Sequence, residues 1–142
     1  MYIKQVSVFL ENENGRLDDA LRILSEGNIN ILSVCIADTA DYGVLRLILG
    51  ESERGCKILK DAGMAARMDD VIAVVVENEV GSFGKVVKMI QDEGIGIRYI
   101  YGLSIPTDGA PIALKTDDQE KTVKVLERGN VKTLSPEDMQ AF

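Results

Sequence analysis

The spacing of the apolar residues changes near residue 12. Val6, Val8 and Leu10 alternate with other residues, and this period of two predicts a strand with one buried face. Further along, the apolar residues lie at positions 17, 20, 21 and 24, a spacing typical of an amphipathic helix. The pattern therefore predicts a strand, a short turn and a helix at the beginning of the sequence.

The same pattern returns after 66 residues, a period that indicates a duplicated small domain rather than a solenoid repeat. The turn "ENENG" at residues 11–15 recurs as "ENEVG" at 77–81, and each copy stands between a strand and an amphipathic helix. Each half then continues with two strands, a helix and a short last strand, at 28–37, 42–50, 52–63 and 64–68 and at 95–104, 109–116, 118–130 and 131–135. In each half the first helix ends at residues that tolerate the left-handed conformation, Gly27 with Asn28 and Glu93 with Gly94.

Each half therefore has the order β-α-β-β-α-β. This is the order of the ferredoxin-like fold, which places its helices on one face of an antiparallel sheet. The sequence predicts an α+β protein of two such units, over residues 1–69 and 70–142, with Asp69 and Asp70 at the join. A unit of about 60 residues buries only about 60% of its extended-chain surface, so we expect the two units to pack together.

Composition narrows the range of functions. The chain has 142 residues and a formal charge of -7, so it lacks the basic surface that binding to nucleic acid requires. No apolar run approaches the roughly 20 residues that span a bilayer, and no signal-peptide pattern precedes the first strand. We expect a cytoplasmic protein with neither nucleic acid nor membrane as a partner.

The sequence offers little for catalysis. It contains no histidine, which removes Ser-His-Asp and Cys-His constellations and most zinc sites. Cys35 and Cys56 are interpreted as small buried or half-buried thiols. The adjacent carboxylates, such as Asp18 with Asp19, point in different directions on a helix or strand and are interpreted as solvated faces and caps. We therefore expect no enzyme activity, no cofactor and no metal site.

Both halves resemble the ACT domain. The resemblance rests on a strand that ends in an Asn-x-x-Gly turn, a helix with a large apolar residue near its start, and an entry into the second strand of the Gly-x-Asn-Ile type. The matching segments are "ENENGRLDDALRILSEGNINI" and "ENEVGSFGKVVKMIQDEGIGI". The family implies a sensor of small molecules, usually amino acids, that are held between two ACT units near the strand-to-helix turns.

Carried onto this sequence, the resemblance implies ligand-binding residues in both halves. They are Asn12, Asn14, Gly15, Arg16, Leu17 and Asn30 in the first half and Asn78, Gly81, Ser82 and Phe83 in the second. A helix that begins at a glycine turn presents free N–H groups to a carboxylate, and an Asn amide both donates and accepts hydrogen bonds. The same glycines, amides and apolar residues can instead serve the turn, the helix cap and the core.

The halves differ at one of these positions, because Gly96 stands where the first half has Asn30. We expect one strong site per chain, a homodimer, and a partner enzyme or regulator that responds to the ligand. The function we expect is that of a regulatory sensor of a free amino acid or a close relative. The alternative is a purely structural oligomerisation module without a ligand.

Overall fold

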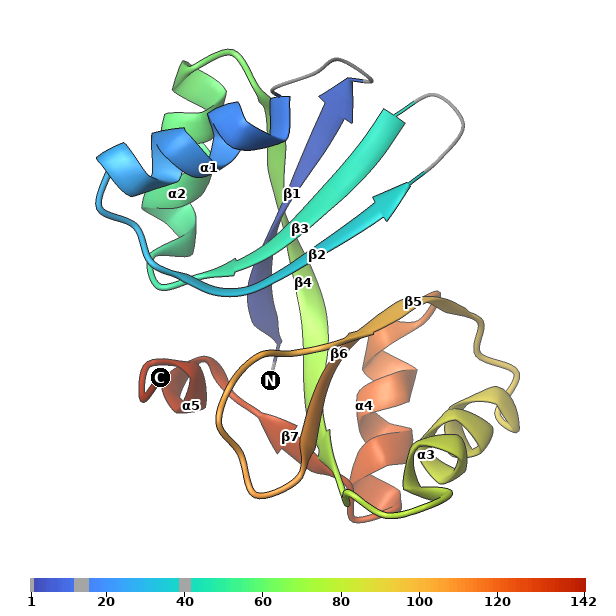
Figure 1. Cartoon of the computed structure of the whole chain (residues 1–142). Coiled ribbons are helices and arrows are strands. Elements are labelled where there is room, and N and C mark those ends of the chain that lie inside the picture. Colours follow the sequence, from blue (N-terminus) through green and yellow to red (C-terminus); the bar gives the residue numbers. More distant parts are fainter. Residues whose placement is uncertain (1, 12–15, 39–41) are drawn as a thin grey trace. The chain divides into compact units, whose positions relative to one another are not determined.

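The computed structural model describes residues 2–11, 16–38 and 42–142. Contacts between Cα atoms divide the chain into two compact units. The first unit spans Lys4–Asp69, and the second comprises Asp70–Phe142 together with Tyr2 and Ile3 (Figure 1). Each unit carries its own hydrophobic core, so the two can be described separately.

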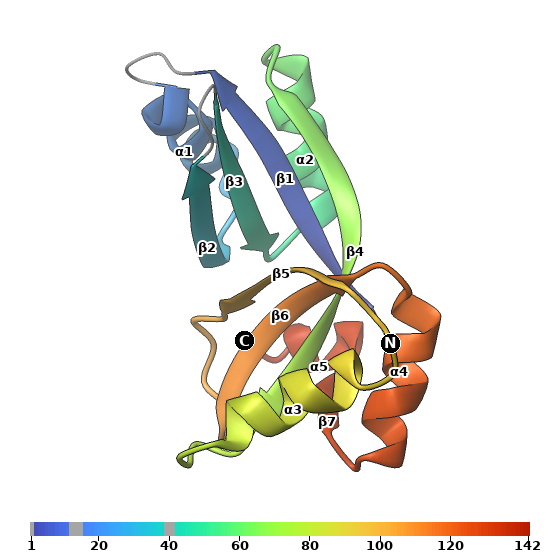
Figure 2. The same ribbon diagram turned by 90° about the vertical axis from the view of Figure 1, so that its right-hand side faces the viewer.

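The first unit has the predicted βαββαβ order. It contains β1 (Ile3–Glu11), α1 (Arg16–Glu26), β2 (Ile31–Asp38), β3 (Tyr42–Leu49), α2 (Ser52–Asp61) and the beginning of β4 (Ala65–Val76). The strands lie in the order β2-β3-β1-β4, and β3 pairs antiparallel with both β1 and β2. Figure 2 shows α1 and α2 on the same face of this sheet.

The second unit repeats the arrangement. After the end of β4 it contains α3 (Ser82–Gln91), β5 (Ile97–Gly102), β6 (Ala110–Thr116), α4 (Gln119–Arg128), β7 (Lys132–Leu134) and α5 (Pro136–Met139). Its strands lie in the order β7-β4-β6-β5, with antiparallel pairing throughout. The predicted fold class, two ferredoxin-like units with helices on one face, is confirmed.

The join predicted at Asp69 and Asp70 lies within a single strand. The strands predicted at 64–68 and from residue 71 onward form one continuous strand, β4. Asp69 accepts a hydrogen bond from the Ser7 hydroxyl at 2.7 Å, and the Asp70 carbonyl accepts one from the Lys115 ammonium at 2.9 Å. Because these bonds satisfy the polar groups within the strand, and no glycine or proline interrupts it, the acidic pair does not form a turn.

The cores use equivalent positions of the repeat. The predicted alternation is confirmed, because Val6, Val8 and Leu10 in β1 and Ile72, Val74 and Val76 in β4 are all buried. The stripes of α1 and α3 bury Ala20 with Leu24 and Val86 with Ile90. Phe83 departs from the pattern, since its side chain is 46% exposed whereas the equivalent Leu17 packs against the first core. Tyr2 packs against the core of the second unit.

In both halves each long helix is followed by a residue with left-handed backbone, but where one half has Asn the other has Gly. The residues after α1 and α3 have left-handed backbone, Asn28 with φ 57° and Gly94 with φ 75°, as predicted. After α2 and α4 the same conformation occurs at Gly63 and Asn130. Asn and Gly are the residues that adopt this conformation at least cost, which explains why either serves.

The short helix α5 begins with a capping box. The Ser135 hydroxyl accepts a hydrogen bond from the Asp138 backbone at 3.1 Å, and the Asp138 carboxylate accepts one from the Ser135 backbone at 2.8 Å. These bonds hold the pKa of Asp138 below its usual value. The stabilisation from this cap is therefore complete above the usual carboxyl pKa and is lost as the pH falls through the lowered pKa of Asp138.

Asn30 and Gly96 occupy equivalent positions, each beside a residue of the neighbouring strand to which its carbonyl is hydrogen-bonded. The backbone N–H of Gly50 donates to the Asn30 carbonyl, and that of Asp117 donates to the Gly96 carbonyl, both at 2.9 Å. A Cβ on Gly96 would collide with the Asp117 carboxylate, which also binds Arg98. Each of these two residue pairs contains one glycine. In the first half the glycine follows β3, and in the second half it precedes β5.

This pairing predicts coupled effects on stability. Gly96 has no positive φ, so Gly96→Ala in an Asp117→Gly background should raise the free energy of unfolding by about 0.4–1 kcal/mol, because alanine restricts the unfolded chain. In the natural background we expect that gain to disappear, because the new Cβ displaces the carboxylate. Denaturant unfolding of the four proteins of the cycle measures the coupling, and equal effects of Gly96→Ala in both backgrounds would contradict it.

Candidate functional site

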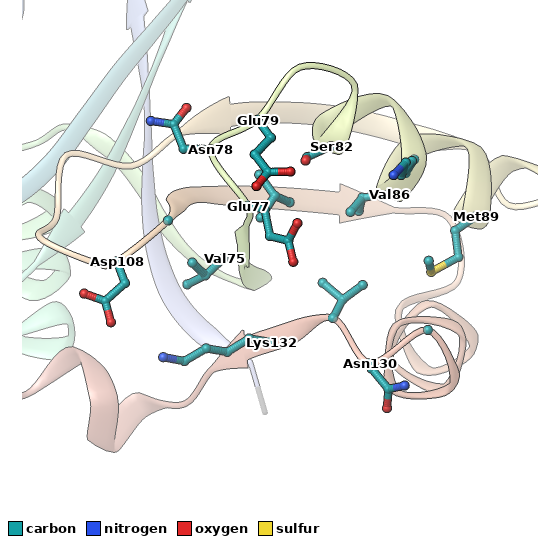
Figure 3. Close-up of a pocket in the computed structure, with 15 residues that line it drawn as sticks. Val75, Glu77, Asn78, Glu79, Ser82, Val86, Met89, Asp108, Asn130 and Lys132 are labelled. Atoms are coloured by element: carbon teal, nitrogen blue, oxygen red, sulfur yellow. The ribbon is translucent and has the colours of Figure 1, made fainter.

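A cavity of about 700 Å³ lies in the second unit. It forms where β4 ends, α3 begins, β6 begins, and α4 passes into β7 (Figure 3). Its lining comprises Val75, Val76, Glu77, Asn78, Glu79, Ser82, Lys85, Val86, Met89, Asp108, Gly109, Gly129, Asn130, Val131 and Lys132. A volume of this size falls within the range of about 300–1,000 Å³ typical of small-molecule sites.

The helix α3 begins at this cavity without a side-chain cap. Gly81 is its N-cap with φ 87°, in the left-handed region, and accepts the first helical hydrogen bond from the Lys85 backbone at 3.1 Å. Ser82, the first residue of the helix, lines the cavity. The first N–H groups of a helix have no partner within it, so this end can receive an anionic group.

Charged side chains of both signs surround the cavity. The carboxylates belong to Glu77, Glu79 and Asp108, and the ammonium groups to Lys85 and Lys132. Figure 3 shows Glu77 and Glu79 directed into the same space, with the Asn78 amide turned away from them. All five charged side chains are exposed, and within the described part of the chain none of them forms an ion pair with another residue.

One wall of the cavity is apolar. Val86 is buried in the core of the second unit, and Met89 and Val131 pack against that core. Figure 3 shows Val86 and Met89 on the α3 side, with Asn130 and Lys132 on the α4–β7 side. The cavity therefore combines a hydrophobic wall with unpaired charges and amides at its rim.

The structure distributes the predicted site residues over several places. Asn78 and Ser82 line the cavity, Gly81 caps α3, and Phe83 is exposed without lining the cavity. In the first half, the predicted residues Asn12, Asn14 and Gly15 lie outside the described residues. Arg16 and Leu17 begin α1, and Asn30 is exposed just before β2.

Arg16 makes a weak ion-pair contact with a residue of its own helix. Its guanidinium lies 4.0 Å from the Asp19 carboxylate. Its Nε atom is buried and has no hydrogen-bond partner among the residues that the structure describes. This donor at the start of α1 remains open to a further acceptor, since a buried N–H without a partner carries a desolvation cost.

Strand register separates the predicted residues within the first unit. Glu11 pairs with Tyr42 at one end of β3, whereas Ile31 pairs with Leu49 at the other. At about 3.4 Å per residue, these positions lie about 24 Å apart. The end of β1 at Glu11 is therefore remote from Asn30 of the same unit.

Sequence reasoning missed the residues that the cavity takes from the turn between α4 and β7. Asn130, Val131 and Lys132 lie there because β7 pairs antiparallel with β4, with Lys132 opposite Val75. The predicted ferredoxin-like order already contained this signal, because it places the start of the last strand beside the end of the first. No sequence pattern distinguished Lys85 and Asp108 from other charged surface residues.

With this geometry in place, the sequence can be compared with known proteins. The family model described as an ACT domain pair matches residues 1–142, so the chain belongs to that family. Among solved structures, protein BT0572 of Bacteroides thetaiotaomicron is 33% identical, with a TM-score of 0.89 over 100% of this chain and 98% of that one. None of the curated proteins compared with the sequence matches it.

More distant structures share the fold. The regulatory subunit of aspartate kinase from Thermus thermophilus, in a ligand-free form, is 11% identical with a TM-score of 0.58 over 88% of this chain and 91% of that chain. A structure of aspartokinase alpha and beta subunits is 17% identical with a TM-score of 0.59 over 89% and 91%. These likenesses concern the architecture alone.

Two structural properties bear on the type of site. Within residues 2–11, 16–38 and 42–142, no His, Cys, Asp and Glu side chains are grouped in threes that could hold a metal ion. Across those same ranges, no helix has the length and apolar character needed to cross a bilayer.

The left-handed N-cap of α3 leads to a prediction with an internal control. Gly81→Ala should lower the free energy of unfolding by about 1–2 kcal/mol, because a Cβ at positive φ is unfavourable. Gly84→Ala, within the same helix, should raise it by about 0.5–1 kcal/mol. An added Cβ meets no atom within 4 Å at either position, so only the backbone differs. Urea unfolding compares the variants, and a loss of the same size in both would contradict the argument.

Proposed function

We propose that this ACT domain pair is a regulatory protein without catalytic activity, located in the cytoplasm. It binds a free amino acid or a close relative and conveys the ligand's level to a partner enzyme or regulator. Membership of the family and the absence of histidine from the sequence support this proposal. The observation that carries it is the separation of Asn30 from the end of β1 at Glu11, because a site that uses both is complete only when two units meet.

The edge of the first unit offers a surface for such pairing. β2 is the outermost strand of its sheet and has no charged residue from Ile31 to Ala37. Val34 and Ile36 pair with Leu47 and Leu45, on the helix side, and are 49% and 50% exposed. An uncharged edge with exposed apolar residues readily pairs with another strand.

A second copy of the chain suits this edge. If two β2 strands pair antiparallel about a two-fold axis, the beginning of one strand lies beside the end of the other. Asn30 of one copy then lies near the end of the partner's sheet where α1 begins. An amino acid held there would receive hydrogen bonds from the Asn30 amide and from groups at the partner's helix start.

The second unit is less suited to the same arrangement. Gly96 has no side-chain amide, and Arg98 and Asp117 form an ion pair at 2.9 Å close to it. We therefore expect one strong interface site per chain rather than an equal site in each unit. The difference between Asn30 and Gly96 also has a packing explanation, because a Cβ at position 96 would collide with the Asp117 carboxylate. This explanation needs no ligand and favours the alternative function, a structural oligomerisation module.

Ligand binding tests the proposal. Calorimetric titration should detect a common amino acid that binds the full chain. Asn30→Ala should weaken that binding about ten- to a hundredfold, because it removes a hydrogen bond to a charged ligand group. Asn12→Ala should act similarly and Asn78→Ala less. Indifference to Asn30→Ala, or two equal sites per chain, would contradict the assignment, and a dimer that binds no amino acid would favour the alternative.

Pairing through β2 is tested independently. The double substitution Val34→Lys with Ile36→Lys should convert a dimer into a monomer, because charges on an edge strand oppose pairing. Val80→Lys is the control, since Val80 is fully exposed in the turn before α3 and should leave the dimer intact. Light scattering coupled to size exclusion gives the mass. A monomeric natural protein, or a dimer that persists in the double variant, would contradict pairing through β2.

A further inference from the structure

Two strands, rather than β4 alone, cross the boundary between the units. β1 crosses it between Ile3 and Lys4, and β4 crosses it between Asp69 and Asp70. The two strands are neighbours in the sheet. The first unit is therefore contiguous in sequence, whereas the second unit needs the beginning of β1 in addition to Asp70–Phe142.

The beginning of β1 belongs to the interior of the second unit. Tyr2 packs against the second core, and Ile3 is only 2% exposed. The pKa of the Tyr2 phenol is raised, first by burial and then by the carboxylates of Glu120, Asp70 and Asp118, which all lie in the second unit. Tyr2 and Ile3 are thus parts of the second unit, although the chain continues from them directly into the first.

A chain of hydrogen bonds joins β1 to β4 within the first unit. The Gln5 side chain donates to the Ser7 hydroxyl at 3.1 Å, and that hydroxyl donates to the Asp69 carboxylate at 2.7 Å. Gln5 and Ser7 are buried, and buried polar groups need their own partners, so this network favours one alignment of the two strands. A folded first unit therefore holds the start of β1 beside β4.

The first unit has no matching dependence on the second. The buried residues of its core all lie between Val6 and Ala66. Its last residue, Asp69, is bound within the unit by Ser7 and by Arg67, whose guanidinium lies 3.3 Å from the carboxylate. The first unit can therefore keep its core and its polar bonds when the second unit unfolds.

The cost of closing a loop gives the size of the dependence. With the first unit unfolded, roughly 65 flexible residues would separate Ile3 from Asp70, and closing a loop of that length lowers a folding equilibrium constant on the order of a thousandfold. A folded first unit removes this cost, because β1 and β4 are already neighbours within it. The second unit should therefore be far more stable when the first is folded.

We propose that the crossing of β1 and β4 is a conformational device that makes the folding of the second unit conditional on the first. The second unit unfolds alone while the first stays folded, whereas unfolding of the first unit always unfolds the second. A ligand or partner that stabilises the second unit then protects both units. One that binds the first unit protects the first alone, because it binds equally well when the second unit is unfolded. The second unit is thus the part of the chain whose order can be regulated separately.

Hydrogen exchange of the full chain tests this order with a matched pair of variants, since it reports the free energy of each local unfolding. Ile29 and Ile95 occupy equivalent positions of the repeat, are each 5% exposed, and belong to the first and the second core. Replacing either by Val should lower protection about two- to tenfold. Ile95→Val should lower the protection of both β6 and β3, whereas Ile29→Val should lower that of β3 alone. In the natural protein, β3 should be better protected than β6.

Tyr2→Ala tests the part that the beginning of β1 plays. Although Tyr2 directly precedes β1, the substitution should act as a change in the second core and lower the protection of both β6 and β3 at least tenfold. Tyr42→Ala is the matched control, because Tyr42 begins β3 and its ring packs against Phe9 within the first unit. It should lower the protection of the first unit alone.

Three results would overturn the proposal. If each Ile→Val variant affects only its own unit, the units are independent. If both variants lower the protection of both units equally, the chain unfolds as one cooperative body. If Tyr2→Ala affects the first unit alone, the beginning of β1 does not support the second core. The two Ile→Val variants keep the test decisive should Tyr2→Ala fail to fold, because each removes only a single methylene group.

Discussion

One strand serves two sheets, and the rest of the architecture depends on it. β4 is the last strand of the first unit and the first strand of the second. A continuous strand needs every backbone group satisfied along its length. The bonds to Asp69 and Asp70 satisfy polar groups where the first half passes into the second. Because β4 ends at Val76, it also determines where α3 begins and where the cavity opens.

The site residues follow from that placement. β7 pairs with β4, so the turn between α4 and β7 lies beside the turn before α3. The two turns bring together residues about 50 positions apart in the sequence, such as Glu79 and Asn130. In contrast, Asn30 and the end of β1 at Glu11 lie at opposite ends of β3 because β2 and β1 run in the same direction beside it.

Much of the fold was predictable because the sequence pattern of each element occurs in both halves. The buried positions Val8 and Val74 have the same alternation, and Asn28 and Gly94 end equivalent helices. The sequence predicted a very short join before β4 continues, but not the bonds that satisfy Asp69 and Asp70, because their partners Ser7 and Lys115 are distant in sequence. The cavity was predicted only at Asn78 and Ser82, since local motifs do not reveal which turns become neighbours.

The position of Tyr2 has a consequence for synthesis of the chain. Tyr2 packs against a core that also contains Leu126 and Val125, whereas the first core is complete by Ala66. During translation the first unit can acquire its whole core while the second half is still being made. The second core, in contrast, must join residues from the beginning of the sequence with residues near its end, and contacts this distant form slowly. Translation from the N-terminus thus favours folding of the first unit before the second.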